Sequence, residues 1–177
     1  MAKIDRRFIK SENEILKAFS ALLNRYELAD ISIQDLVEEA DINKSTFYLH
    51  YSNLGQVLNT LQDKLITDVF EIYQSSDGDF CLFLVRLIDG IKKSRKIYRT
   101  VLLNSTQYFF ENIYSIFWGS YSETDLKNKH LDVSIYSRMS LIHSLCNILL
   151  LWCQGGCVSS KEEVIERLNR DIEHYLK

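Results

Sequence analysis

Apolar positions recur three and four residues apart along most of the chain, which is the spacing that puts them on one face of an α-helix. Stripes of this kind run through residues 15–26, 33–40, 54–72, 80–91 and 164–176. The 177 residues include no proline and only six glycines, so few positions interrupt a helix. The pattern therefore predicts an all-α protein with short connections.

Several of these stripes follow a side chain that is suited to capping a helix N-terminus. Three segments pair a capping residue with an acidic or amide residue three positions later, as in a capping box: Ser32 with Asp35, Asn53 with Gln56, and Ser160 with Glu163. Asn43 is a further N-cap. The run Ser11-Glu12-Asn13-Glu14 has the same form, so we expect the first helix to begin near Ser11.

Residues 31–51 predict two short helices joined by a tight turn at Asp41-Ile42. The first buries Ile33, Leu36, Val37 and Ala40, which share one face. The second runs from Lys44 to Tyr51, with Phe47 and Tyr51 facing inward. We expect five side chains of the second helix to face outward: Lys44, Ser45, Thr46, Tyr48 and His50. Two such helices, supported by a preceding one, are typical of a helix-turn-helix.

The run SIQDLVEEA followed by DINKSTFYLHYSN resembles the DNA-binding domain of the TetR/AcrR family of bacterial transcriptional regulators. The ending WCQGGCVSSKEEV resembles the ligand-binding domain of many such regulators from Gram-positive bacteria. The resemblance implies a three-helix helix-turn-helix DNA-binding domain in residues 1–55. It also implies a helical ligand-binding and dimerisation domain in residues 56–177. Asp41 stands where the family often has glycine, and Leu54 stands where it usually has a lysine, which leaves one phosphate contact open.

Eight residues are candidates for contact with DNA: Lys44, Ser45, Thr46, Tyr48, His50, Gln34, Ser32 and Asn53. Lys44 is placed to reach a guanine edge or a phosphate. The hydroxyls of Ser45 and Thr46 are short enough to contact bases or backbone. The resemblance implies that Tyr48 and His50 bind phosphate, although Tyr48 has the alternative of packing beside Phe47.

The remaining candidates lie at helix starts. Gln34, on the exposed side of the preceding helix, is expected to reach a base. Asn53 begins a helix whose free N–H groups suit a phosphate. Residues 1–10 carry Lys3, Arg6, Arg7 and Lys10, and are either a frayed terminus or a basic arm that contacts phosphates or the minor groove.

Beyond the DNA-binding motif the pattern predicts a connecting helix from Leu54 to about Gln74, a loop at 75–79 and further helices. The basic run from Lys92 to Arg99 is interpreted as a solvated helix end, with nucleic-acid binding as the alternative. The aromatic-rich segment 98–121 fits a core or the wall of a pocket for an apolar or aromatic ligand. We expect a loop at 122–131. The apolar segment 132–154 is expected to be a buried helix that is covered partly by a second copy of the chain.

Charge and cysteine content narrow the classes of partner. The net charge is −3 and the pI is about 5.8, so contact with nucleic acid requires a local basic surface. The cysteines at 81, 146, 153 and 157 form no CxxC pair, which favours reduced thiols in the cytoplasm. A zinc site from the last three with His143 matches no common ligand spacing. The N-terminus lacks the apolar core of a secretion signal, and we expect no metal and no cofactor.

No catalytic motif is present: the sequence contains no P-loop, GxGxxG, GxSxG or HExxH pattern. We therefore expect a protein that is not an enzyme. The resemblance to TetR/AcrR regulators implies a homodimeric, ligand-responsive regulator. It would act as a repressor that a small molecule releases from a palindromic operator, with an effector pocket whose residues the sequence does not identify. Two alternatives remain: an activator or adaptor that acts through a partner protein, and a small-molecule binding protein without DNA function.

Overall fold

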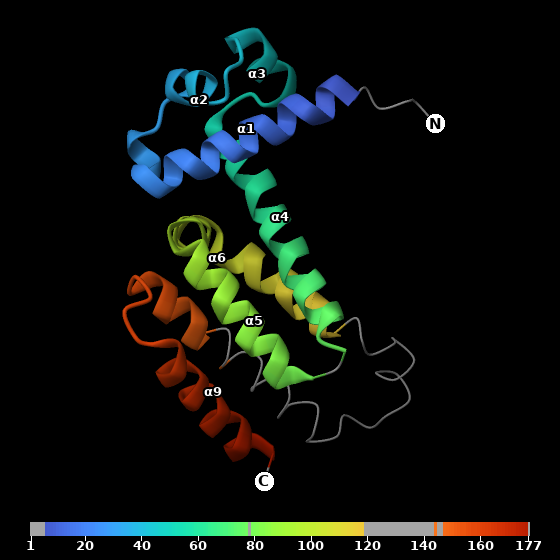
Figure 1. Ribbon diagram of the computed structural model, residues 1–177, viewed down its shortest axis with the longest axis vertical. Coiled ribbons are helices and arrows are strands. Elements are labelled where there is room, and N and C mark those ends of the chain that lie inside the picture. The colour runs from blue at the N-terminus through green and yellow to red at the C-terminus, as the bar shows by residue number, and fades with distance from the viewer. Residues whose placement is uncertain (1–5, 78, 119–143, 145–146, 177) are drawn as a thin grey trace. The chain divides into compact units, whose positions relative to one another are not determined.

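The computed structural model describes residues 6–77, 79–118, 144 and 147–176, and in these ranges every regular element is a helix (Figure 1). The helices are α1 (Arg6–Arg25), α2 (Ile33–Glu39), α3 (Lys44–His50), α4 (Leu54–Ser75), α5 (Phe80–Lys93), α6 (Arg95–Trp118) and α9 (Lys161–Leu176), with a 3-10 turn, η1, at Leu28–Asp30. Residues 147–154 are also helical. The predicted all-α class is confirmed.

The chain divides into two compact units, Met1–Leu65 and Ile66–Lys177. The division falls inside α4, so one continuous helix contributes residues to both. The sequence placed the boundary between residues 55 and 56, near the start of the same helix. α4 itself has nearly the predicted extent, from Leu54 to Ser75.

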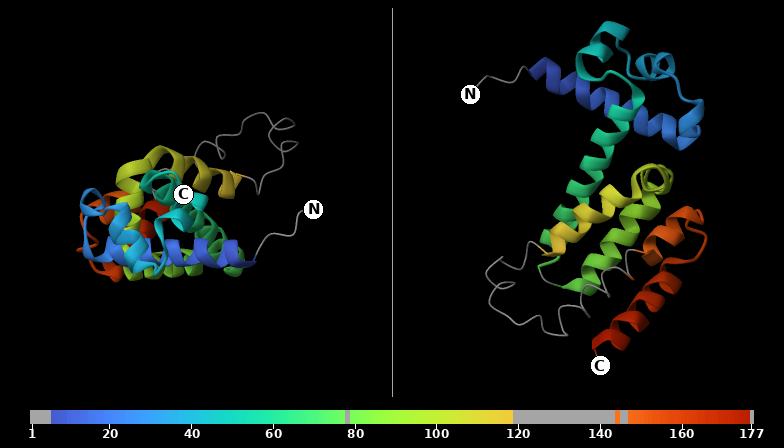
Figure 2. Two further views of the ribbon diagram at one scale, coloured as in Figure 1. Left: turned by 90° about the horizontal axis from the view of Figure 1, so that it is seen from above. Right: turned by 180° about the vertical axis from the view of Figure 1, so that it is seen from behind.

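The first unit is organised around α1, and α2 and α3 lie together on one side of it (Figures 1 and 2). α1 buries Ile15, Phe19 and Leu23, which meet Leu36 of α2 and Phe47 of α3 in a common core. Helices of seven residues are unstable in isolation because nucleation costs more than a few hydrogen bonds return. Burial of these apolar side chains is therefore what holds α2 and α3 in place.

The first helix is longer than predicted. α1 begins at Arg6, so Ser11 lies inside the helix and does not cap it. Its hydroxyl donates instead to the carbonyls of Arg7 and Phe8, each at 3.0 Å. Residues 6–10 carry no proline or glycine, and nothing in them stops the helix from extending past the capping pattern. Tyr26, expected in the apolar stripe, follows the end of α1 and is half exposed.

The other predicted caps are confirmed. The side chains of Ser32 and Asp35 close a reciprocal capping box at the start of α2, and Asn43 caps α3. Asn53 accepts from the N–H of Gln56 at 3.1 Å, and Ser160 accepts from the N–H of Glu163 at 3.1 Å. Asp41 has a φ of 51°, the left-handed conformation that glycine or a short polar residue tolerates in such a turn.

The second unit contains α5, which packs against α6 and α9 (Figure 2). Its core includes Leu84 and Ile88 of α5, Val101 of α6 and Leu168 of α9. An ion pair links α5 to α9. Lys161 Nζ, at the start of α9, lies 2.5 Å and 2.6 Å from the two carboxylate oxygens of Asp89 in α5. The Asp79 side chain caps α5 as the predicted loop 75–79 ends.

Part of the sequence interpretation lies outside the described residues. This holds for the predicted loop at 122–131, for His143 and Cys146, and for most of the apolar segment 132–154, of which 147–154 is helical. Within the described ranges, no helix is long and apolar enough to cross a membrane. In the same ranges, no cluster of histidine, cysteine and acidic side chains is arranged to hold a metal ion.

Candidate nucleic-acid interface

The inner face of α3 is fixed by aromatic packing. Phe47 is fully buried, and its ring centroid lies 6.1 Å from that of Tyr51, the residue that ends the helix. The hydroxyl of Tyr51 donates to a carboxylate oxygen of Glu12 in α1 at 3.3 Å. Burial raises the pKa of Tyr51, so this hydroxyl keeps its proton near neutral pH. The inner face of α3 is thus held at Phe47 by the core and at Tyr51 by the hydrogen bond to α1.

The N-terminus of α3 is organised by one carbonyl oxygen. Asn43 Oδ1 accepts from the backbone N–H of Thr46 at 2.8 Å. It also accepts from the hydroxyls of Thr46 at 2.9 Å and Ser45 at 2.6 Å. The sequence predicted that these hydroxyls contact DNA, and it did not predict that both donate to the capping residue. Their hydrogens point toward Asn43, which leaves oxygen lone pairs as the groups that face outward.

The outer face of α3 carries Lys44, Ser45, Tyr48 and Leu49, all of them exposed. The Tyr48 side chain is 56% exposed, and its ring meets Phe47 edge to face with centroids 5.3 Å apart. The ring of Tyr48 thus packs beside Phe47, which was one of the two alternatives, and more than half of the side chain remains exposed. Thr46 is half-buried beside this face.

His50 does not face outward as predicted. It is half-buried against α1, with Nε2 at 2.7 Å from Ser11 Oγ and its ring centroid 3.9 Å from that of Phe8. Which of the two groups donates in this hydrogen bond depends on the tautomer of His50. Nδ1 is buried and has no hydrogen-bond partner among the described residues. Burial lowers the pKa of His50, and Glu12 acts weakly in the opposite direction.

The helical wheel explains this error. His50 lies three residues after Phe47, a spacing that places it at the border of the inner face. By the same rule Leu49, four residues after Ser45, belongs on the outer face, where it is 74% exposed. The sequence interpretation missed Leu49 because it selected polar residues. An exposed leucine on a predicted recognition helix was the available signal.

Three further candidates occupy helix starts. Ser32 is exposed, but its hydroxyl donates to Asp35 at 2.6 Å, and these hydrogen bonds lower the pKa of the Asp35 carboxyl. Gln34 is exposed and its amide donates to Glu38 one turn later. Asn53 is exposed and caps α4. All three are accessible, and each has a structural task in addition to any contact with a ligand.

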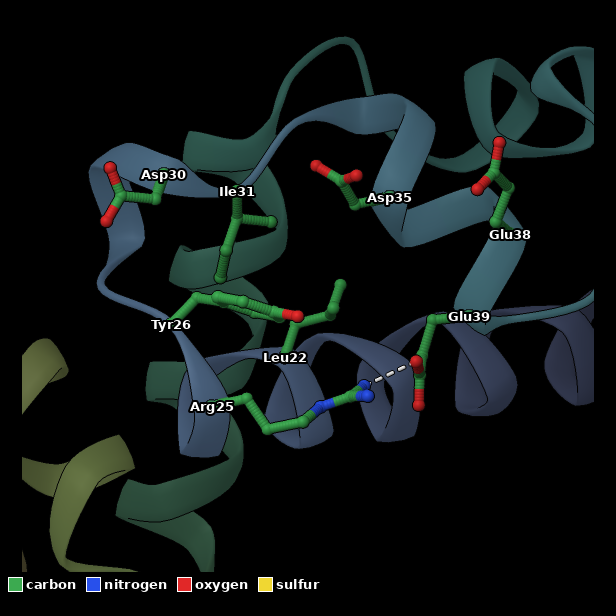
Figure 3. A pocket seen from close by; sticks show the side chains of 8 residues that line it. All are labelled: Leu22, Arg25, Tyr26, Asp30, Ile31, Asp35, Glu38 and Glu39. Carbon is green, nitrogen blue, oxygen red and sulfur yellow. Dashed lines mark ion pairs between the residues drawn. The ribbon is translucent and has the colours of Figure 1, made fainter.

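A hollow of about 480 Å³ lies in the same unit, where the end of α1 faces α2 (Figure 3). Its lining includes four acidic residues: Asp30, Asp35, Glu38 and Glu39. Arg25 reaches across it to pair with Glu39, as the dashed line in Figure 3 marks. Carboxylates repel phosphate groups, so this side of the unit is unsuited to DNA and the outer face of α3 is the better surface.

Comparison with solved structures identifies the fold. The structure of a TetR transcriptional regulator from Streptococcus agalactiae 2603V matches with a TM-score of 0.63 and 24% sequence identity, over 97% of this chain and 94% of that one. The dihydroxyacetone kinase operon activator DhaS matches with a TM-score of 0.64 and 17% identity, over 95% of each chain. The resemblance to TetR-type regulators is therefore confirmed at the level of the fold.

Comparison of sequences gives one curated match, an uncharacterized HTH-type transcriptional regulator, YxbF, of Bacillus subtilis (strain 168). Identity is 30% over 83 residues, which is 45% of this chain. The chain spans 22% of the length of that relative. No protein-family model matches the sequence. These similar proteins are named as transcriptional regulators.

Proposed function

We propose that the protein is a DNA-binding transcriptional regulator of the TetR type, with α3 as the helix that enters the major groove. The observation that carries this proposal is the outer face of α3, where Lys44, Tyr48 and Leu49 project from a helix whose opposite face is buried. The similarity in fold and the sequence match to a helix-turn-helix regulator support it. The major groove is wide enough to admit one α-helix.

The contacts divide into two kinds. Tyr48 and the amides at the start of α4, which Asn53 caps, are suited to phosphates and would set the register on the duplex. Lys44 and the short side chains of Ser45 and Thr46 are suited to base edges. Leu49 adds an apolar surface of the type that contacts a thymine methyl group. His50 would act indirectly, by attaching α3 to α1 through Ser11.

The test begins with selection of bound sequences from random duplex DNA, followed by affinity measurements on the selected site. Lys44→Ala and Tyr48→Ala should each weaken binding by about 1–3 kcal/mol. Lys17→Ala and Tyr26→Ala are matched controls, because these residues are also exposed but lie on α1 or just after it. Equal losses in all four variants would show that the outer face of α3 is not the contact surface.

The proposal includes a homodimer on a near-palindromic operator. Helix 147–154 carries Leu151, which is 66% exposed, beside half-buried Leu149 and Leu150. A two-fold dimer that covers this apolar surface relates the two α3 helices by the same axis. They would then meet major grooves about 34 Å apart, or a small multiple of that distance.

Sedimentation of the free protein tests the dimer. The wild type should sediment as a dimer at micromolar concentration, and Leu151→Glu should give a folded monomer with lost operator binding, because the interface would bury an unpaired carboxylate. Leu103→Glu, at an exposed leucine of α6, is the control. A monomeric wild type would exclude both the dimer and the palindrome.

The proposal also includes the sign of regulation. We favour a repressor whose ligand binds the DNA-free geometry more tightly than the DNA-bound one, which is the condition for release. One protein of similar fold is described as an operon activator, so activation through a partner remains the second candidate. Transcription from the selected site in the presence and absence of the protein distinguishes the two. We expect the protein to act in the cytoplasm.

A further inference from the structure

A second basic feature lies in the C-terminal unit, away from the helix-turn-helix. A pocket of about 340 Å³ is lined by Arg95, Lys96 and Arg99 of α6 and by Gln154, Gly155 and Gly156 of the turn that follows helix 147–154. No acidic side chain is among these lining residues. Arg95 forms no ion pair with any residue that the structure describes. Three cations therefore converge on one small concave space in a chain whose net charge is −3.

A structural explanation for these cations is that they neutralise the C-terminus of helix 147–154. Backbone N–H groups already satisfy several of the carbonyl groups at this helix end. The N–H groups of Gly155, Gly156 and Cys157 donate to the carbonyls of Leu151, Cys153 and Trp152 at 2.9, 3.0 and 2.8 Å. Gly156 has a φ of 79°, so this is a Schellman-type ending in which the last turn satisfies its own carbonyls.

Magnitudes also argue against that explanation. A helix terminus is equivalent to about half an elementary charge, and the N-terminus of α6, which begins at Arg95, contributes a similar positive amount. Three full positive charges exceed what one helix end requires. The charge of Arg95 reaches the neighbouring thiol of Cys157: burial raises the pKa of this thiol, and the hydrogen bond from Cys153 and the charges of Arg95 and Lys92 act in the opposite direction. The lining of the pocket is cationic, and none of its residues is acidic.

We propose that this pocket is a binding site for the oxyanion group of a small soluble molecule, a phosphate or a comparable polyanion. Arg95 and Arg99 lie one helical turn apart on α6, and guanidinium groups bind phosphate oxygens through paired N–H donors. Lys96 adds a third cation to the lining. The volume is near the lower end of the range for ligand pockets, about 300–1,000 Å³, which fits a small ligand.

The turn residues suit the same ligand. A Cβ atom placed on Gly156 would meet no atom within 4 Å, so the space beside this residue is open. Gly155 and Gly156 line the pocket with backbone alone, and only Gly156 has open space at its Cβ position. A duplex is a poor occupant, because its phosphates follow a convex backbone. The inference goes beyond the proposed function and does not depend on it.

The experiment measures binding of pyrophosphate and inorganic phosphate to the full chain by calorimetry, with sodium chloride at matched ionic strength. Arg95→Gln/Arg99→Gln should weaken pyrophosphate binding about tenfold or more, as expected for the loss of hydrogen bonds between charged groups. Lys92→Gln/Lys93→Gln is the matched control, because it removes the same charge from the same basic run outside the pocket lining. It should change the affinity less than about threefold, since screened charges outside the site contribute little.

Hydrogen exchange on the wild type gives a second measurement that does not depend on the folding of a variant. Pyrophosphate should slow exchange at residues 95–99 and 154–157, and leave α3 unchanged. Three results would overturn the proposal: no binding by the wild type at millimolar pyrophosphate, equal losses in the two double variants, or a loss of DNA affinity without any loss of pyrophosphate binding. The last would assign the cations to a DNA surface.

Discussion

The outer face of α3 and the pocket at the start of α6 both carry positive charge, but they differ in shape. α3 is convex: its core-facing side is held by Phe47, and Lys44 and Tyr48 project from it. The pocket is concave and gathers three cations against a glycine turn. A convex helix fits a groove in a large partner, whereas a concave cluster surrounds one small group.

The difference also concerns the density of charge. Among the side chains on the outer face of α3, only Lys44 carries a full positive charge, so that face depends on shape and on hydrogen bonding for its selectivity. The acidic hollow nearby shows a third arrangement, in which the Glu39 carboxylate is neutralised by Arg25 of the same chain. The kind of ligand that a charged surface can bind therefore depends on the residues that surround the charges, and not on the number of charged residues in the sequence.

Replacing Asn43 should have the largest effect, and it should act on the outer face of α3 without affecting the pocket at the start of α6. Asn43→Ala removes the N-cap of α3 and should destabilise the N-terminal unit by about 0.5–2 kcal/mol. It should also weaken DNA binding, because Ser45 and Thr46 lose their common acceptor. Denaturant unfolding and DNA affinity measure these effects, and pyrophosphate affinity should be unchanged. Asn43→Ser, which keeps a capping oxygen, should retain most of the stability; if it loses as much as alanine does, capping is not the role of Asn43.

A smaller effect should follow from His50. Its folded-state pKa is lowered by burial, so the unfolded chain binds the proton more tightly. The stability contributed by neutral His50 is fully present above the unfolded pKa of about 6.5 and is lost as the pH falls through the lower folded value. The melting temperature of the wild type should therefore fall more between pH 7.5 and 5.5 than that of His50→Gln. Parallel curves for the two proteins would show that His50 does not titrate differently on folding.

The elements that the sequence predicted well are those fixed by neighbouring residues. The boundaries of α2 and α3 follow from Ser32 and Asn43, and the left-handed turn follows from Asp41. A cap needs only a short polar side chain and the N–H groups two or three residues later, so a local pattern contains all the information. The exception is Ser11, where the same pattern occurs inside a helix because no residue before it ends the helix.

Features that depend on distant partners were not predictable in this way. The contact between Ser11 and His50 joins residues 39 positions apart, and that between Asp89 and Lys161 joins residues 72 positions apart. The pocket at α6 requires Arg95 and Gly156 to be brought together by the packing of the second unit. The sequence interpretation singled out the basic run 92–99 but interpreted it as a solvated helix end. It had no means of placing the glycine turn beside that run.

Under the proposed function, the hydrogen bonds of Asn43 would limit what α3 recognises on DNA. As long as Ser45 and Thr46 donate their hydroxyl hydrogens to Asn43 Oδ1, their oxygens present only lone pairs to a base pair. In a complex with DNA they would accept from the amino groups of adenine N6 or cytosine N4, and would have no hydrogen to offer to guanine N7 or O6. At these two positions the helix would favour bases that donate a hydrogen bond. Asn43 imposes this preference, and it need not touch DNA itself.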